Sequence, residues 1–182
     1  MNAIYIVLIT LIIVVAIVVT LYIRKMNKLK FYKTRTVQAQ SVIEEELEKR
    51  YELIISSKDI VKKNTKKDMD FYEQLEKTKS ANISTIEFEK QLTTALATLE
   101  LISNDYPKIN DKKDFKELMR SLEESTTKLD AAKSFYNSNN NKLNELLKKF
   151  PTNLIGKIKG YEINSNYEAK EIFNAIEEDI RL

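Results

Sequence analysis

The sequence predicts an all-α protein: an N-terminal membrane-spanning helix followed by an antiparallel bundle of three to four long helices. Glycine and proline occur only twice each in 182 residues, which disfavours hairpins and tight turns. Residues 3–23 carry no charge and are dense in Ile, Val and Leu. Further along the chain, apolar residues recur at the spacing of amphipathic helices.

The apolar run at residues 3–23 has the length of a membrane span. At about 1.5 Å of rise per residue, it covers roughly the 30 Å hydrocarbon core of a bilayer. The alternative is a cleaved signal peptide, which has a basic start, a shorter apolar stretch and a small-residue cleavage site. The sequence shows none of these, so we expect residues 1–25 to form a transmembrane anchor.

A basic segment follows the apolar run, and no acidic residue occurs among residues 1–35. Its members are Arg24, Lys25, Lys28, Lys30, Lys33 and Arg35. The positive-inside rule predicts a cell-membrane protein with a short external N-terminus and a cytoplasmic C-terminal domain. These side chains are also candidates for contact with anionic lipid headgroups, or they serve only as a topology signal. The acidic balance of the remaining chain disfavours nucleic acid as a partner.

The first soluble helix is predicted from one apolar stripe, and no Gly or Pro separates it from the anchor. The stripe contains Val37, Ile43, Leu47, Tyr51, Ile54 and Val61. Anchor and helix are therefore expected to form one rod of about fifty to sixty residues. A polar turn near 64–68 should precede a second helix that begins at Met69. The spacing of Ser84 and Glu87 matches a capping box, which leaves open whether residues 68–104 form one helix or two.

A stripe from Leu92 to Ile102 is predicted to end at Tyr106–Pro107, because proline disfavours helical geometry in the residue before it. Asp111 or Asp114 is expected to cap the next helix. Large apolar residues then recur every seven positions, at Phe115, Leu122, Leu129, Tyr136, Leu143 and Phe150. We expect Tyr136 and Phe150 in the core. Leu118, Ala132 and Leu146 fill the companion position.

Five asparagines lie between residues 137 and 144, yet the seven-residue phase continues through them. This stretch is therefore expected to be helical. A buried Asn139 or Asn140 would need hydrogen bonds and could fix the register of packed helices; both could equally lie on a solvated face. Pro151 is expected to end the helix, and residues 163–182 to form a short C-terminal helix around 172–180 or a tail.

The residue inventory limits the chemistry, because the chain has no Cys, His or Trp. Disulfides, thiol nucleophiles and imidazole catalysis are excluded. A carboxylate metal site is the remaining enzymatic option, with Glu44, Glu48, Glu123 or Glu124 as ligands. Di-metal helical bundles also use histidine, so we expect these acids to be solvated and expect no metal or cofactor.

Short motifs in residues 26–161 resemble the LemA family. They are Arg50, Tyr106–Pro107, Phe115, Leu118, Leu122, Tyr136–Asn137, Leu143–Asn144, Phe150–Pro151 and Gly160–Tyr161. The resemblance implies one membrane helix with a short extracytoplasmic N-terminus and a cytoplasmic helical bundle at 26–162. It supplies an architecture rather than a reaction. The chain departs from the family pattern at Ile55–Ser56, at Thr126–Thr127 (usually Glu-Asn) and at Leu143 (usually Tyr).

These observations favour a non-enzymatic interaction or scaffolding module anchored in the membrane, which holds an unidentified protein partner or a second copy of itself. The alternative is a membrane-tethered coiled-coil stalk of a division or secretion assembly. Such a stalk needs long unbroken heptads, and Pro107 and Pro151 interrupt them. A carboxylate-based metal enzyme is the least favoured class.

Overall fold

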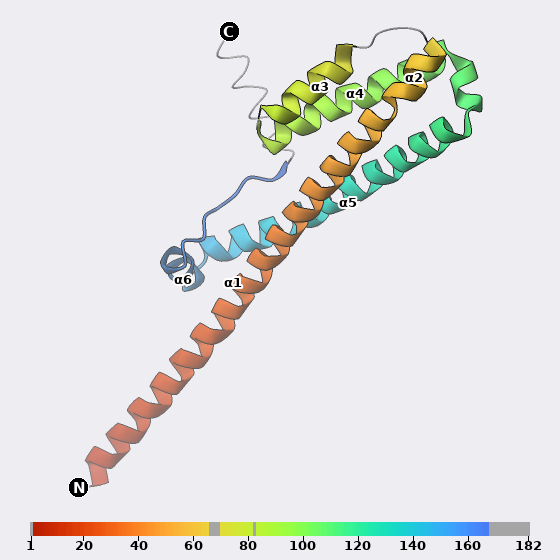
Figure 1. The fold of residues 1–182 in the computed structure, drawn as a ribbon. Helices are drawn as coiled ribbons and strands as arrows, with labels where there is room; N and C mark the ends of the chain where they lie inside the picture. The colour runs from red at the N-terminus through yellow and green to blue at the C-terminus, as the bar shows by residue number, and fades with distance from the viewer. Residues whose placement is uncertain (1, 66–69, 82, 168–182) are drawn as a thin grey trace. The chain divides into compact units, whose positions relative to one another are not determined.

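The computed structural model describes residues 2–65, 70–81 and 83–167, and every regular element in these ranges is a helix. The all-α prediction is confirmed. In chain order the elements are α1 (Asn2–Ser56), α2 (Lys58–Thr65), α3 (Asp70–Ser80), α4 (Thr85–Asp105), the 3-10 helix η1 (Pro107–Asp111), α5 (Lys113–Lys148) and α6 (Thr152–Ile158) (Figure 1). The helix predicted at residues 172–180 lies outside the described residues.

The chain divides into two compact units. Unit 1 contains residues 1–38 and 136–166, and unit 2 contains residues 39–135 and 167–182. Helices α1 and α5 each contribute residues to both units. Each unit is described separately below.

The predicted rod is present, because α1 is a single helix of 55 residues. Its N-terminal part is long and apolar enough to cross a membrane, and no side chain in that stretch is buried within the structure. Val37 was expected in the core, but its side chain is 48% exposed. The remaining members of the stripe belong to unit 2, where Ile43, Leu47 and Ile54 are buried.

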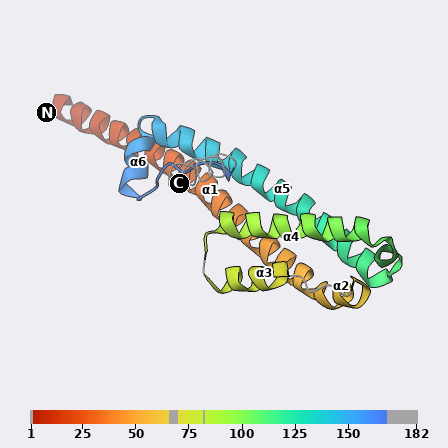
Figure 2. The ribbon, with the colours of Figure 1, turned by 90° about the horizontal axis from the view of Figure 1, so that it is seen from above.

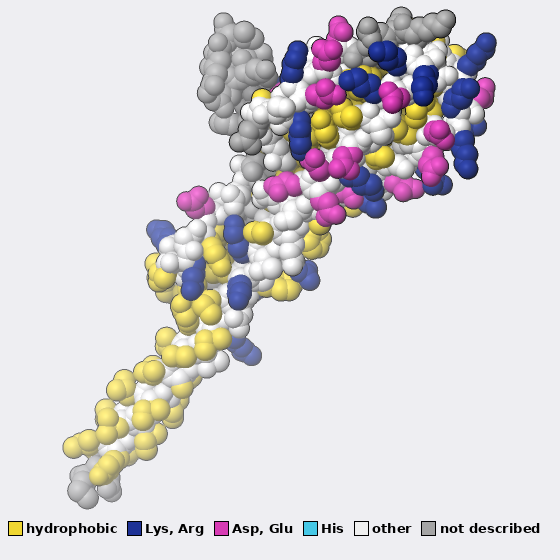
Figure 3. Space-filling view, in the orientation of Figure 1, with side chains coloured by type: hydrophobic (Ala, Val, Ile, Leu, Met, Phe, Trp, Pro, Cys, Tyr) yellow, Lys and Arg dark blue, Asp and Glu magenta, His cyan; other side chains and the backbone are white. Residues whose placement is uncertain are grey.

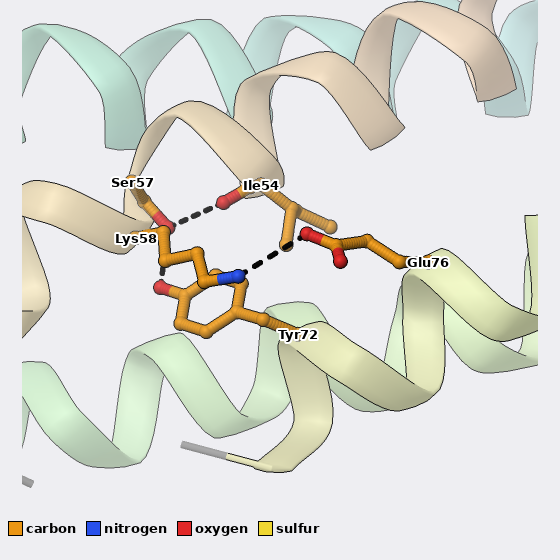
Figure 4. A network of polar contacts seen from close by, with 5 residues as sticks. All are labelled: Ile54, Ser57, Lys58, Tyr72 and Glu76. Carbon is orange, nitrogen blue, oxygen red and sulfur yellow. Dashed lines mark hydrogen bonds and ion pairs between the residues drawn. The ribbon is translucent and has the colours of Figure 1, made fainter. Parts of the chain in front are cut away.

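The length of α1 agrees with the predicted fifty to sixty residues. A break at Ser57, which separates α1 from α2, was not predicted. The buried Ser57 hydroxyl donates to the carbonyl oxygen of Ile54 (2.6 Å) and lies 2.7 Å from the Tyr72 hydroxyl (Figure 4). Because the serine proton is used on Ile54, the Tyr72 hydroxyl donates to Ser57. Lys58 and Glu76 form an ion pair (3.2 Å) beside this contact. A serine that bonds to its own helix thus fixes α3 against the α1–α2 junction.

The segment at 68–104 forms two helices over its described residues, α3 and α4. Ser84 precedes α4 with extended backbone angles, and its hydroxyl accepts the Glu87 N–H (3.2 Å). This confirms the N-cap that the Ser-x-x-Glu spacing predicts. The cap satisfies an amide that has no partner within the helix.

Unit 2 is a helical bundle built around the C-terminal part of α1. Here α1 and α4 run in one direction, and α3 and α5 run in the other (Figures 1 and 2). Among the described residues, its buried apolar side chains are Ala39, Ile43, Leu47, Ile54, Val61, Tyr72, Leu75, Leu92, Ala95, Leu99, Ile102, Ile109, Phe115, Leu118, Leu122, Leu129 and Tyr167. The heptad positions of α5 are therefore core positions in this unit, as predicted.

Helix α4 ends before Tyr106–Pro107, as predicted, and η1 follows at once. The predicted cap of α5 is wrong, since neither Asp111 nor Asp114 directly precedes the helix. Asp111 belongs to η1, whereas Asp114 lies within the first turn of α5. A carboxylate in a first turn still interacts favourably with the helix dipole.

Unit 1 packs α6 and the C-terminal part of α5 against α1. Its core contains Leu29 of α1, Leu143 and Leu147 of α5, and Ile155 of α6. A Cβ atom at Gly156 would overlap the Leu147 side chain, so glycine permits this close approach. Gly160 ends α6 with φ +66°, and the Tyr161 N–H donates to the Gly156 carbonyl (2.9 Å). This Schellman-type end brings the chain back along α5.

Candidate interaction site

An open groove lies on unit 2 between α4, η1 and α5, with a volume of about 660 Å³. Apolar and charged side chains both line it: Leu96, Glu100, Ser103, Asn110, Phe115, Lys116, Met119, Arg120, Leu122, Glu123, Thr126 and Thr127. Thr126 and Thr127 are among the positions at which the chain departs from the LemA pattern. In this lining Phe115 and Leu122 are buried, and the exposed charged residues are Glu100, Lys116, Arg120 and Glu123.

A buried arginine lies behind this groove. Arg50 of α1 is only 3% exposed, and its Nη2 donates to the Thr126 hydroxyl (2.9 Å). Burial lowers the pKa of Arg50, and the nearby carboxylates of Glu89, Asp130 and Glu46 oppose that shift. The guanidinium stays charged at neutral pH because its ordinary pKa is so high.

Two of these carboxylates, those of Glu89 and Glu46, also have lysine partners. Lys133 of α5 forms an ion pair with Glu89 of α4, and Lys128 Nζ lies 4.0 Å from Glu46 Oε1. Within the described residues, Arg50 Nε and one oxygen of each glutamate have no hydrogen-bond partner. This polar cluster joins α1, α4 and α5 inside unit 2 through paired charges.

The predicted signature residues do not converge on one site. In unit 2, Arg50, Phe115 and Leu122 are buried, and Tyr106 and Pro107 form the junction of α4 with η1. In unit 1 the signature residues are Tyr136, Asn137, Asn144, Phe150 and Pro151. Tyr136 is 3% exposed, as its predicted core position requires, and burial raises its pKa.

The prediction for Phe150 is wrong, because its side chain is 79% exposed. Helix α5 ends at Lys148, so the seven-residue phase no longer determines the direction of the side chain at position 150. Phe150 precedes Pro151 through a cis peptide bond, and α6 starts directly afterwards.

The asparagine run has a structural role that the sequence left open. Asn139 and Asn140 are both buried, at 6% and 0% exposure. Asn140 Nδ2 donates to the Asn164 carbonyl oxygen and to Asn166 Oδ1, each at 2.9 Å. Asn144 donates to the same carbonyl (2.7 Å) and accepts the Asn164 N–H (3.2 Å). Two asparagines four residues apart thus bind the segment that follows α6.

Unit 1 is strongly basic because folding adds lysines to the predicted basic segment. It contains eleven Lys or Arg and two acidic residues, a net charge of +9, whereas unit 2 has nineteen basic and twenty-five acidic residues, a net charge of −6. Arg24, Lys25, Lys28, Lys30 and Arg35 are exposed and Lys33 is half-buried. The Arg35 guanidinium stacks over the Phe31 ring at 4.2 Å.

The four glutamates considered as metal ligands are not gathered together. Glu48 pairs with Lys79, and Glu124 lies 3.7 Å from Arg120. Glu44 accepts a hydrogen bond from Gln40 (3.1 Å), and Glu123 lines the groove described above. Among the described residues, no group of three acidic side chains lies close enough to hold a metal ion.

Several site residues are not evident from the sequence alone. Glu46, Glu89 and Lys133 look like ordinary helix-surface charges, and only the fold shows that they meet near Arg50. Asn140 and Asn144 lie one turn apart, on one face of α5. Their partner at Asn164 lies in a non-helical segment that no periodicity marks.

These features define an all-α protein with one apolar N-terminal helix and two charge-segregated helical units. The LemA family model matches residues 39–179, which is most of the chain. The protein therefore belongs to the LemA family. No curated protein matches the sequence.

Proposed function

We propose that this LemA family protein is a single-pass membrane protein that holds a partner protein at the cytoplasmic face of the membrane. In this proposal the apolar part of α1 crosses the bilayer, and the protein acts by binding rather than by catalysis. The observation that carries the proposal is the run of exposed Ile, Val and Leu side chains at residues 3–23, which has no cover within the structure.

The charge distribution supports the same assignment. Unburied apolar side chains over a span of this length are unfavourable in water, and a bilayer removes that cost. The positive residues lie in the unit that contains this run, and the acidic balance lies in the other unit. A positive region directly after a single span is retained on the cytoplasmic side.

Cysteine labelling tests the topology, and the chain contains no native Cys to interfere. Asn2→Cys probes the N-terminus, and Ser138→Cys probes an exposed position on α5. We expect a membrane-impermeant maleimide to label Asn2→Cys in intact cells and to label Ser138→Cys only after permeabilisation. The reverse pattern would refute the orientation. Recovery of both variants in the soluble fraction would refute anchoring.

The groove between α4, η1 and α5 is the proposed partner surface. A photo-crosslinking amino acid at Thr127, which lines the groove, is compared with one at Thr94, an exposed threonine of α4 outside it. We expect a defined protein adduct from position 127, none from position 94, and loss of the adduct when residues 1–25 are deleted. Equal labelling from both positions would contradict a specific groove.

A further inference from the structure

Unit 1 has an apolar surface on and beside α6. The helix turns Thr152, Ile155 and Gly156 inward, where all three are buried. Leu154 and Ile158, four residues apart on the same helix face, are 50% and 76% exposed. Together with the exposed Phe150 they form what we call the α6 apolar surface. Such large side chains gathered on one short helix mark a contact with another apolar phase.

The α6 apolar surface lies next to the part of α1 that leaves the membrane. Ile155 of α6 packs in one core with Leu29 of α1, and Met26 packs against the same core. Leu29 follows Ile23, the end of the apolar run, by six residues, which is a rise of about 9 Å along the helix. Figures 1 and 2 show α6 lying across the direction of α1. If α1 crosses a bilayer, α6 therefore lies along its surface.

Exposed lysines flank the residues of the α6 apolar surface along the chain. Lys148 and Lys149 precede it, and Lys157 and Lys159 lie at its end. Figure 3 shows hydrophobic side chains in this region with Lys and Arg side chains beside them. Of the two acidic residues of unit 1, Glu145 is paired with Lys149. A short amphipathic helix with apolar residues on one side and lysines around it has the composition of an interfacial membrane helix.

We propose that α6 is a second membrane contact, in which Phe150, Leu154 and Ile158 enter the boundary between headgroups and acyl chains. Lys148, Lys149, Lys157 and Lys159 then bind anionic headgroups. The inference rests on the proposed function, since it requires α1 to span the bilayer. We infer that lipid covers the α6 apolar surface, because this surface adjoins the proposed membrane span of the same unit. The positive charge of the neighbouring lysines also complements an anionic leaflet. With two contacts, the membrane fixes the rotation of unit 1 as well as its attachment.

Tryptophan fluorescence tests this proposal, because the chain contains no native Trp. The variants are Phe150→Trp and Ile158→Trp for the α6 apolar surface, Ile12→Trp for the anchor, and Leu101→Trp as a control. Leu101 is 64% exposed and belongs to unit 2. Each full-length variant is reconstituted in vesicles of phosphatidylcholine and phosphatidylglycerol, with or without bromine on the acyl chains. Circular dichroism verifies that each variant keeps its helix content.

We expect blue-shifted, bromine-quenched emission from Phe150→Trp, Ile158→Trp and Ile12→Trp, and neither effect from Leu101→Trp. Replacing Lys157 and Lys159 by Gln in the Phe150→Trp protein should reduce quenching in anionic vesicles and leave it unchanged in pure phosphatidylcholine. If Ile12→Trp alone is quenched, the α6 contact is refuted and the anchor stands. If Ile12→Trp is not quenched, anchoring itself fails. Blue-shifted but unquenched emission at positions 150 and 158 would show a protein occupant, such as a second copy, and would also refute the lipid contact.

Discussion

Replacing Asn140 by Asp reverses two hydrogen bonds without changing the size of the side chain. In the native protein the Asn140 amide donates to the Asn164 carbonyl oxygen and to Asn166 Oδ1, and the residue is 0% exposed. An aspartate at position 140 would place its own oxygen against those two oxygens. A protonated acid could still donate one of the two bonds, so burial should keep the side chain neutral and raise its pKa above that of the unfolded chain.

The cost of Asn140→Asp follows from these contacts. The neutral acid loses one hydrogen bond, which is about 1 kcal/mol. Keeping an acid protonated costs about 1.4 kcal/mol for each pH unit above its ordinary value near 3.9, which adds about 4 kcal/mol at pH 7. Because the folded-state pKa is raised, the deficit is small below about pH 4 and grows as pH rises. We therefore expect a loss of about 5 kcal/mol at pH 7 and about 1 kcal/mol at pH 4.

Amide hydrogen exchange on the full-length protein in detergent measures this loss for residues 161–166. Wild type and variant are compared at each pH, so the intrinsic exchange rates cancel. Asn141→Asp is the matched control: Asn141 Oδ1 accepts from Asn166 Nδ2 (2.9 Å), and a carboxylate keeps that acceptor. Wild-type protection in Asn140→Asp at pH 7 would show that Asn140 does not hold this segment.

Three further predictions concern unit 2. Arg50→Met should destabilise the unit by about 3 kcal/mol, because the buried Glu89 carboxylate and the partly buried Glu46 carboxylate lose a nearby cation. Urea unfolding in detergent measures this loss, with substitution of the exposed Lys116 by Met as the control. Burial raises the pKa of Tyr72 to about 12. Between pH 10 and pH 12, the free energy of unfolding of the wild type should therefore fall by about 2 to 3 kcal/mol more than that of Tyr72→Phe. Parallel plots of unfolding free energy against pH for the two proteins would contradict this. Ser84→Ala should destabilise α4 by about 1 kcal/mol, because it removes the side-chain cap of that helix. Amide hydrogen exchange should then be faster in the first turn of α4 and unchanged in α3.

The helical fold is readable from the sequence because each helix buries one stripe of a regular period. Leu122, Leu129 and Tyr136 are buried at intervals of seven, as predicted. The break at Ser57 was not predicted, because serine does not stop a helix by itself. Ser57 interrupts the helix where its hydroxyl accepts a hydrogen bond from Tyr72, fifteen residues further along the chain. Periodicity identifies which face is buried, whereas interruptions that depend on distant partners have no local pattern.

The asparagine run shows the same limit for a polar cluster. The seven-residue phase predicts a helix through it, and the structure agrees. Burial of Asn140 is stable only because Asn164 and Asn166 accept its hydrogen bonds, and those residues follow α6 and the turn at Gly160. The sequence therefore predicts the conformation of the run, and its role depends on a chain reversal more than twenty residues further on.

The error at Phe150 and the charge of unit 1 have one physical origin. A heptad predicts burial only while the helix continues, and α5 ends at Lys148. The reversal that follows carries Phe150, Lys157 and Lys159 into the unit that contains the apolar part of α1. Along the chain, the basic segment that contains no acidic residue ends at Arg35. In unit 1, five lysines of residues 136–166 join this segment. In the proposed membrane contact, lipid would cover the exposed Phe150 side chain, so the same burial rule would apply with lipid in place of a protein core.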